Sequence, residues 1–127
     1  MPNLPATKTV ELEWDNGWLT IWFNQPEKRN ALTDEMRDDM LSVLGAVEDQ
    51  RSVRGITLRG RGGVFCAGGD LKHFQSEFQT QATQDDIRAM SREAAAIMHR
   101  IFRAPQVTIA VVEGAAVAGG FGVMCCA

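Results

Sequence analysis

The sequence predicts an α/β fold, and three observations lead to this prediction. Short runs rich in apolar and β-branched residues alternate with longer segments whose apolar residues recur at helical spacing. The run Val107–Val112 is almost continuously apolar, as expected of a strand covered on both faces of a sheet. The chain has 127 residues, of which 45% are hydrophobic, and this size suits one domain with one core.

The first predicted element is a β-hairpin. Val10–Trp14 alternates apolar with acidic residues, and Trp18–Phe23 is rich in aromatic and β-branched residues. Asp15–Gly17 between them has the composition of a tight turn.

A helix is predicted to follow the loop at residues 24–30. Thr33 can cap its start, and Asp34 and Glu35 stand in the first turn, where the helix dipole favours acids. Five apolar residues then recur at helical spacing, namely Met36, Met40, Val43, Leu44 and Val47. We expect this stripe to lie in the core.

The middle of the chain is predicted to form a strand and a short helix. Val53–Arg59 has the composition of a strand, and Val64–Cys66 leads into a glycine-rich turn. A short helix is expected over Leu71–Phe78, followed by a polar, mobile surface segment over Gln79–Gln84.

The longest predicted helix ends at Arg103-Ala104-Pro105, with Asp85 or Asp86 as its cap. Its apolar stripe consists of Ile87, Met90, Ala94, Ile97, Met98 and Ile101. The apolar strand at residues 107–112 follows.

Composition makes several classes of function improbable. The 13 basic residues are interspersed with 16 acidic ones, the formal net charge is -3, and so neither nucleic acid nor an anionic membrane is an expected partner. The first residues show no basic stretch followed by an apolar one, and no apolar run approaches the roughly 18 to 20 residues that span a bilayer, so we expect neither a leader sequence nor a membrane span. Three cysteines, two of them adjacent at Cys125–Cys126, fit reduced thiols of a soluble cytoplasmic protein better than a disulfide framework.

Other candidate site residues have simpler interpretations. His73 and His99 have no acidic or cysteine partner at ligand spacing, so no metal is expected. Glu113 could act as a base, although a turn residue is more often solvated or locally bonded, and Asp70 fits a helix start. The Gly60-x-Gly62 pair lacks the third glycine of a dinucleotide loop.

Two glycine-rich loops, Cys66–Leu71 and Ala118–Gly122, point to chemistry. Each follows an apolar run at a position where a helix can begin, so each can present an unpaired backbone N–H, such as that of Gly69. Two such donors can stabilise one oxyanion, although an ordinary strand-to-helix turn is the alternative interpretation of either loop alone. Because the chain has no G-x-S-x-G nucleophile, an enolate of a thioester is the expected oxyanion.

Three segments resemble the crotonase superfamily, the enoyl-CoA hydratase and isomerase family. Asn24–Leu32 is similar to its N-x-P-x-x-x-N-A-L signature, and Gly62–Lys72 contains its F-x-A-G-x-D-[IL] segment. Pro105–Gly122 is similar to its P-x-[IV]-A-x-[IV]-x-G-x-A-x-G-G-G stretch. The resemblance implies a crotonase-type ββα spiral core that is incomplete at the C-terminus, with residues 1–127 as the N-terminal part of a single domain.

The resemblance also implies a site for an acyl-CoA thioester. The backbone N–H groups of Gly69 and Gly119 would be the oxyanion donors. The substrate-binding residues would be Lys28, Arg29, Ala31, Cys66, Ala67, Gly69, Asp70, Leu71 and Lys72. Lys28 and Arg29 would approach the nucleotide end of coenzyme A, where their charge suits phosphates, although solvated surface charge is an equal alternative. Coenzyme A would enter as part of the substrate, with no further cofactor.

The chain departs from the family pattern at Gly122, where the hydratases carry a catalytic glutamate. Isomerisation of a double bond therefore fits better than hydration, although a hydratase or lyase of fatty acid metabolism remains the competing expectation. A second glutamate, and the helices used for assembly into trimers or hexamers, would lie beyond Ala127. The chain is thus expected to be a subunit completed by a second chain, a fragment that needs a C-terminal half, or a non-catalytic protein that binds coenzyme A.

Overall fold

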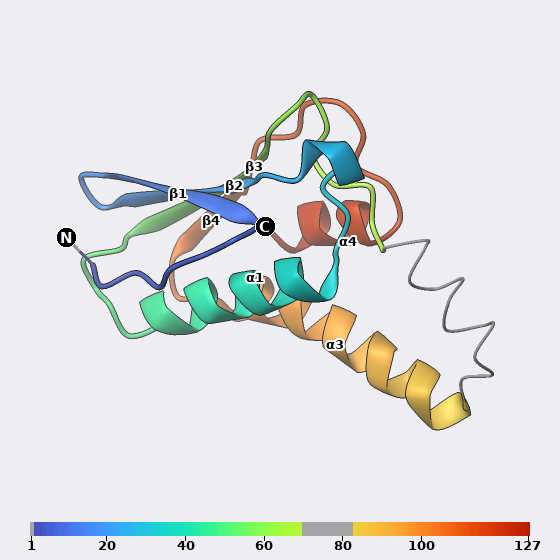
Figure 1. Ribbon diagram of the computed structural model, residues 1–127. Helices are drawn as coiled ribbons and strands as arrows, with labels where there is room; N and C mark the ends of the chain where they lie inside the picture. Colours follow the sequence, from blue (N-terminus) through green and yellow to red (C-terminus); the bar gives the residue numbers. More distant parts are fainter. Residues whose placement is uncertain (1, 70–82) are drawn as a thin grey trace.

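A four-stranded sheet in the order β1-β2-β3-β4 forms the centre of the protein. The computed structural model describes residues 2–69 and 83–127 (Figure 1). β1 (Val10–Asp15) and β2 (Trp18–Phe23) form the predicted hairpin, whose turn residues have positive φ. β3 (Gly55–Gly60) and β4 (Val107–Ala110) continue the sheet in parallel with β2, so the predicted α/β class is confirmed.

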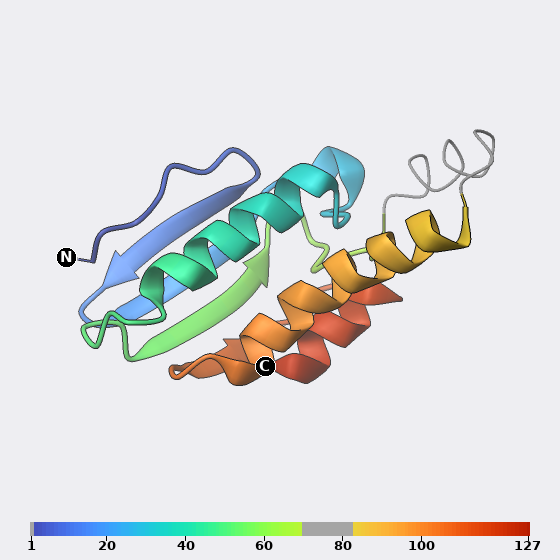
Figure 2. The ribbon, with the colours of Figure 1, turned by 90° about the horizontal axis from the view of Figure 1, so that it is seen from below.

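Helices connect the strands. The short 3-10 helix η1 (Pro26–Lys28) follows β2, and α1 (Asp34–Val47) lies across one face of the sheet (Figure 1). Figure 2 shows the long α3 (Gln84–Arg103) beside α1 and α4 (Gly119–Cys126), and contacts join α3 to both. None of the described helices is both long enough and apolar enough to span a membrane.

The first helix begins as predicted. The Thr33 hydroxyl accepts a hydrogen bond from the Met36 N–H at 3.1 Å, which satisfies one unpaired donor of the first turn. All five residues of the predicted apolar stripe are buried between α1 and the sheet. They face Leu19, Ile21, Phe23, Ile56 and Leu58, which alternate with half-buried residues along β2 and β3.

The cap predicted for α3 is wrong by two or three residues. Thr83, and not Asp85 or Asp86, precedes the helix: its hydroxyl accepts from the Asp86 N–H, and the Asp86 carboxylate accepts from the Thr83 N–H. This capping box satisfies two donors at once, which a single aspartate cap cannot do. Hydrogen bonds from the Thr83 backbone N–H and from the Thr83 side chain lower the pKa of the Asp86 carboxyl. The short helix expected over Leu71–Phe78 and all but the end of the polar segment lie outside the described residues.

The last strand is not covered on both faces as the sequence suggested. β4 is an edge strand, and Val107 and Ile109 are 61% and 44% exposed. In register with β3, Thr108 and Ala110 lie on the side of the helices, so Val107 and Ile109 lie on the other face of the sheet. The α3 stripe is likewise only partly buried: Ile97 and Ile101 are in the core, but Ile87 is 43% exposed.

Candidate active site

The loops that follow β2, β3 and β4 gather at one end of the sheet (Figure 1). The loops after β2 and β3 are joined by backbone hydrogen bonds: the Ala67 N–H donates to the Arg29 carbonyl at 3.0 Å, and the Leu32 N–H donates to the Gly68 carbonyl at 2.6 Å. Leu32 thereby forms a parallel bridge with Gly69. The residues before α1 therefore hold one side of the first glycine loop.

The second glycine loop holds the other side. Cys66 forms a parallel bridge with Ala116, and the Val117 N–H donates to the Cys66 carbonyl at 3.2 Å. Phe65, just before the bridge, packs edge to face on Phe23 with ring centroids 5.4 Å apart. The loop after β3, which is the first glycine loop, is thus bonded to the loops after β2 and β4, and Phe65 packs it against the core of the sheet.

The buried side chain of Asn30 joins the loops after β2 and β3 by hydrogen bonds. It is fully buried, its Oδ1 accepts from the Gln25 N–H at 2.8 Å, and its Nδ2 donates to the carbonyls of Arg61 and Val64 at 3.0 and 2.9 Å. Its φ of 54° lies in the left-handed region that asparagine tolerates better than most residues. Sequence reasoning did not assign this role; an asparagine in a turn directly before two apolar residues is its only sequence signal.

Glycines allow the two loops to touch. A Cβ at Gly68 would lie 3.0 Å from the Gly119 nitrogen and from the Val117 carbonyl oxygen. A Cβ at Gly120 would overlap the Cys66 carbonyl oxygen. We expected small residues here so that a ligand could approach the backbone, but Gly68 and Gly120 are also required for contact between the loops.

The two predicted oxyanion donors lie on these touching loops. Gly119 is the first residue of α4, where N–H groups have no partner within the helix. Within residues 2–69 and 83–127, neither the Gly119 nor the Gly69 N–H donates to another backbone carbonyl. The bridge to Leu32 engages the Gly68 carbonyl and leaves the Gly69 N–H out of that bond. Two N–H donors on adjoining loops can stabilise negative charge on one ligand atom.

The turn into α4 is strained. Ala118 has φ 49° and ψ -119°, a conformation that alanine rarely adopts. Such strain costs on the order of 1–3 kcal/mol and persists where surrounding contacts enforce it. The close contacts that Gly68, Gly119 and Gly120 make across the two loops can enforce this conformation of Ala118.

The other predicted binding residues are distributed around the loops. Lys28 ends η1 and Arg29 follows it, and both are exposed. Ala31 and Cys66 are buried. Burial raises the pKa of the Cys66 thiol, although a hydrogen bond from the Gly68 backbone lowers it in part. Ala67 is half-buried, whereas Asp70, Leu71 and Lys72 lie outside the described residues.

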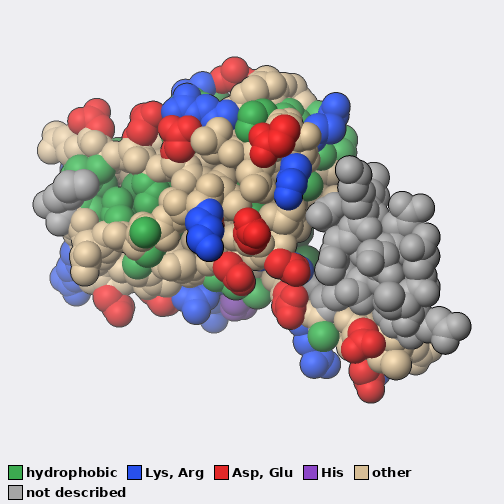
Figure 3. All heavy atoms as spheres, in the orientation of Figure 1, with side chains coloured by type: hydrophobic (Ala, Val, Ile, Leu, Met, Phe, Trp, Pro, Cys, Tyr) green, Lys and Arg blue, Asp and Glu red, His purple; other side chains and the backbone are tan. Residues whose placement is uncertain are grey.

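Glu113 is engaged in a local ion pair. Its carboxylate contacts the Arg59 guanidinium at 2.5 Å. Arg59 and Arg61 both stack on the Trp22 ring, 4.4 and 3.7 Å from its centroid. Of the two interpretations of Glu113, the locally bonded one therefore fits the structure. On the face drawn in Figure 3, acidic and basic side chains of the described residues are interspersed.

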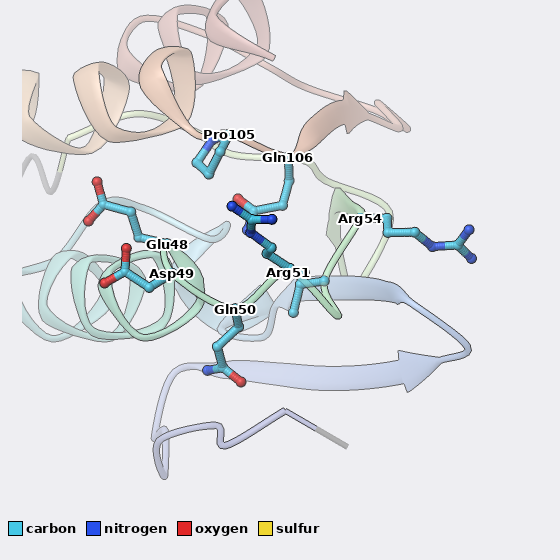
Figure 4. A pocket seen from close by; sticks show the side chains of 8 residues that line it. Glu48, Asp49, Gln50, Arg51, Arg54, Pro105 and Gln106 are labelled. Carbon is cyan, nitrogen blue, oxygen red and sulfur yellow. The ribbon is translucent and has the colours of Figure 1, made fainter.

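A hollow of about 520 Å³ lies at the opposite end of the sheet from the glycine loops. It is lined by Glu48, Asp49, Gln50, Arg51, Val53, Arg54, Pro105 and Gln106. Figure 4 shows Arg51 extending toward Gln106 and Arg54 pointing away. These residues precede β3 and β4, whereas the loops follow them. Among the residues that the structure describes, no three His, Cys, Asp or Glu side chains are grouped as metal ligands.

Comparison with known proteins identifies the family. The family model for enoyl-CoA hydratase/isomerase matches residues 13–127. The chain is 33% identical over 116 residues to hydroxycinnamoyl-CoA hydratase-lyase of Pseudomonas fluorescens, covering 90% of this chain and 41% of that protein. It is 33% identical over 113 residues to 4-chlorobenzoyl coenzyme A dehalogenase-1 of an Arthrobacter species, covering 89% of this chain and 41% of that protein.

The solved structures agree with the sequences. The structure of Pseudomonas aeruginosa AtuE superposes with a TM-score of 0.88 at 40% identity, covering 94% of this chain and 45% of that one. The chain thus spans about 40% of the length of the curated relatives that it matches. Its four-stranded α/β fold corresponds to the N-terminal part of crotonase-fold proteins. The chain therefore belongs to the enoyl-CoA hydratase/isomerase family, the crotonase superfamily.

Proposed function

We propose that this chain binds an acyl-CoA thioester and stabilises its enolate through the backbone N–H groups of Gly69 and Gly119. The observation that supports this most directly is the contact between the two glycine loops, each of which carries one of these N–H groups, neither bonded to a backbone carbonyl of residues 2–69 and 83–127. Removing one donor from an oxyanion hole typically costs about 10²–10³-fold in rate. Two such donors are therefore a substantial part of a catalytic site.

The proposal assigns coenzyme A to the outer part of the site. The two curated relatives described above both carry coenzyme A in their names, although the reactions named differ. Lys28 and Arg29 are exposed beside the first loop and can meet phosphate groups. Ala31, Cys66 and Ala67, together with the stretch Gly69–Lys72, would line the path of the thioester. Coenzyme A enters as part of the substrate.

Isomerisation of a double bond is the reaction that we propose first. The two N–H groups hold the enolate oxygen while one carboxylate moves a proton between two carbons of the acyl group. α4 carries no acidic residue, and Gly122 stands where the hydratases of this family carry glutamate. A hydratase or lyase, whose acid and base both come from outside residues 1–127, is the second candidate.

The site is proposed to be completed by another polypeptide segment. Residues 1–127 would form the N-terminal part of a single crotonase-like domain. Apolar side chains at Val107, Ile109 and Phe121 are exposed and could be covered by that segment or by other subunits of a trimer or hexamer. A second chain that supplies the C-terminal half is one form of this proposal. A cytoplasmic location stays a prediction.

Replacing Gly69 by proline tests the assignment, because proline has no backbone N–H. In the enzyme that contains this chain, Gly69→Pro should lower the turnover of enoyl-CoA substrates by at least about 10²-fold. Gly69→Ala is the matched control, since it keeps the N–H and should retain much more activity.

Three other outcomes would change the conclusion. A nearly normal rate in Gly69→Pro would rule out Gly69 as an oxyanion donor. Affinity for coenzyme A without turnover of any enoyl-CoA, with every copurifying chain present, would indicate a binding or structural subunit. Residues 1–127 that bind coenzyme A only after a C-terminal half is added would indicate an incomplete site.

A further inference from the structure

α3 and α4 meet at Met98 and Gly122. A Cβ at Gly122 would lie 2.7 Å from the Met98 Cε and 3.0 Å from its Sδ, closer than ordinary van der Waals contact allows. The methionine side chain therefore occupies the space that any larger residue at position 122 would need. The size of the side chain at position 98 and the absence of one at position 122 are therefore coupled.

This pair lies on the same face of α4 as the proposed oxyanion donor. Gly119 and Gly122 are three residues apart, so their Cβ positions would be about 5–6 Å from each other on one side of the helix. A Cβ at Gly119 would lie 3.2 Å from the Leu32 Cδ1 and 3.5 Å from the Gly68 Cα. The face therefore points toward the crossing of the two loops, and the Met98 methyl group lies beside it at Gly122, a residue about one helical turn along α4 from Gly119.

The surroundings of this face are apolar. Leu32 contributes a methyl group beside Gly119, and Met98 contributes a thioether beside Gly122. Met98 is only partly buried although it packs against the core, so part of its surface is accessible to a ligand. Methionine has three rotatable bonds and adapts to the shape of an apolar neighbour.

We propose that Met98, with room provided by Gly122, sets the length of the acyl group that the site accepts. This inference rests on the proposed function. A thioester carbonyl at the Gly119 N–H places the acyl chain along the glycine face toward the Met98 methyl. The site therefore prefers short apolar acyl groups, and the thioether closes the far end.

Shortening Met98 tests this preference. The dissociation constants of coenzyme A, butyryl-CoA and octanoyl-CoA are measured by titration calorimetry for the enzyme that contains this chain together with its C-terminal half. Met98→Ala should change the ratio of octanoyl-CoA to butyryl-CoA affinity by at least about tenfold in favour of octanoyl-CoA. Met98→Leu keeps most of the side-chain volume and should retain the original preference. Met124→Ala removes the same atoms from a methionine of α4 and should leave the ratio unchanged.

The contact itself is tested without a ligand. Alanine suits a helix better than glycine, but with Met98 present the new methyl group forces the end of the thioether side chain to move, so Gly122→Ala should raise the melting temperature little or not at all. The same substitution should raise it more in the Met98→Ala background, where the obstructing atoms are absent. Effects of the two substitutions that simply add would show that the pair does not interact and would overturn the inference.

The outcomes separate the two proposals. Retained binding of both thioesters with an unchanged ratio in Met98→Ala would overturn the role of Met98 and leave the proposed function intact. Failure of the complete enzyme, with its C-terminal half present, to bind coenzyme A or either thioester would count against the proposed function itself, and the inference would fall with it. A changed ratio in Met124→Ala would also contradict the assignment to Met98.

Discussion

The region around α1 and the region around β4 and α4 differ in how completely they bury their apolar residues. In the first, the α1 stripe packs against β2 and β3 and forms a closed core. In the second, Val107 and Ile109 are exposed, and Phe102 and Phe121 are 73% and 54% exposed. The proposed site lies where these regions meet, because its first loop is held by the core and its second leads into α4. A closed core on one side and an exposed apolar surface on the other suit a site of the kind proposed, which further protein completes.

The largest effect is expected from equal truncations in the two regions. Ile56 is fully buried in the core, so Ile56→Ala should lower the free energy of unfolding by about 2–5 kcal/mol. Ile109→Ala makes the same change on the exposed face of β4 and should cost less than about 1 kcal/mol. Urea unfolding of residues 1–127 measures both. Similar losses would mean that β4 is as well packed as the core, contrary to the comparison.

Asn30 offers a second way to disturb the boundary between the regions. Asn30→Ala leaves a buried N–H and two carbonyls without their partner, so the free energy of unfolding should fall by about 2–3 kcal/mol. Asn30→Gly removes the same bonds but relieves the positive φ, so comparing the two variants separates hydrogen bonding from strain. Asn24→Ala is the exposed control and should change stability by less than about 0.5 kcal/mol. If Asn30→Ala costs no more than the control, the network does not hold the loops.

The smallest effect is expected at the strained turn. Ala118→Gly relaxes the φ of 49° and should stabilise the chain by about 1 kcal/mol, since glycine adopts this conformation without a steric penalty. Ala116→Gly is the control in the same loop, where φ is not positive, and it should destabilise by about 0.5–1 kcal/mol. Denaturation midpoints measure both changes. Destabilisation by Ala118→Gly would mean that the turn stores no strain.

Local patterns predicted the hairpin and α1 because their signals lie within a few residues. The Thr33 cap and the five residues at helical spacing are both confirmed. The cap of α3 was wrong because Thr83 and Asp86 act as a pair, and a rule applied to single acids favours the aspartate. The exposure of β4 could not be predicted, since an apolar run looks the same whether or not a second layer covers it.

The sequence by itself determined the fold class, the family and the two glycine loops, because strand ends followed by glycine are short-range patterns. Only the tertiary structure decided that Asn30 joins the loops after β2 and β3, that Gly68 and Gly120 let the glycine loops touch, and that Met98 fills the space beside Gly122. These contacts join residues from different elements of the fold. No periodicity in one segment encodes them, since they depend on how the sheet brings separate loops to one end.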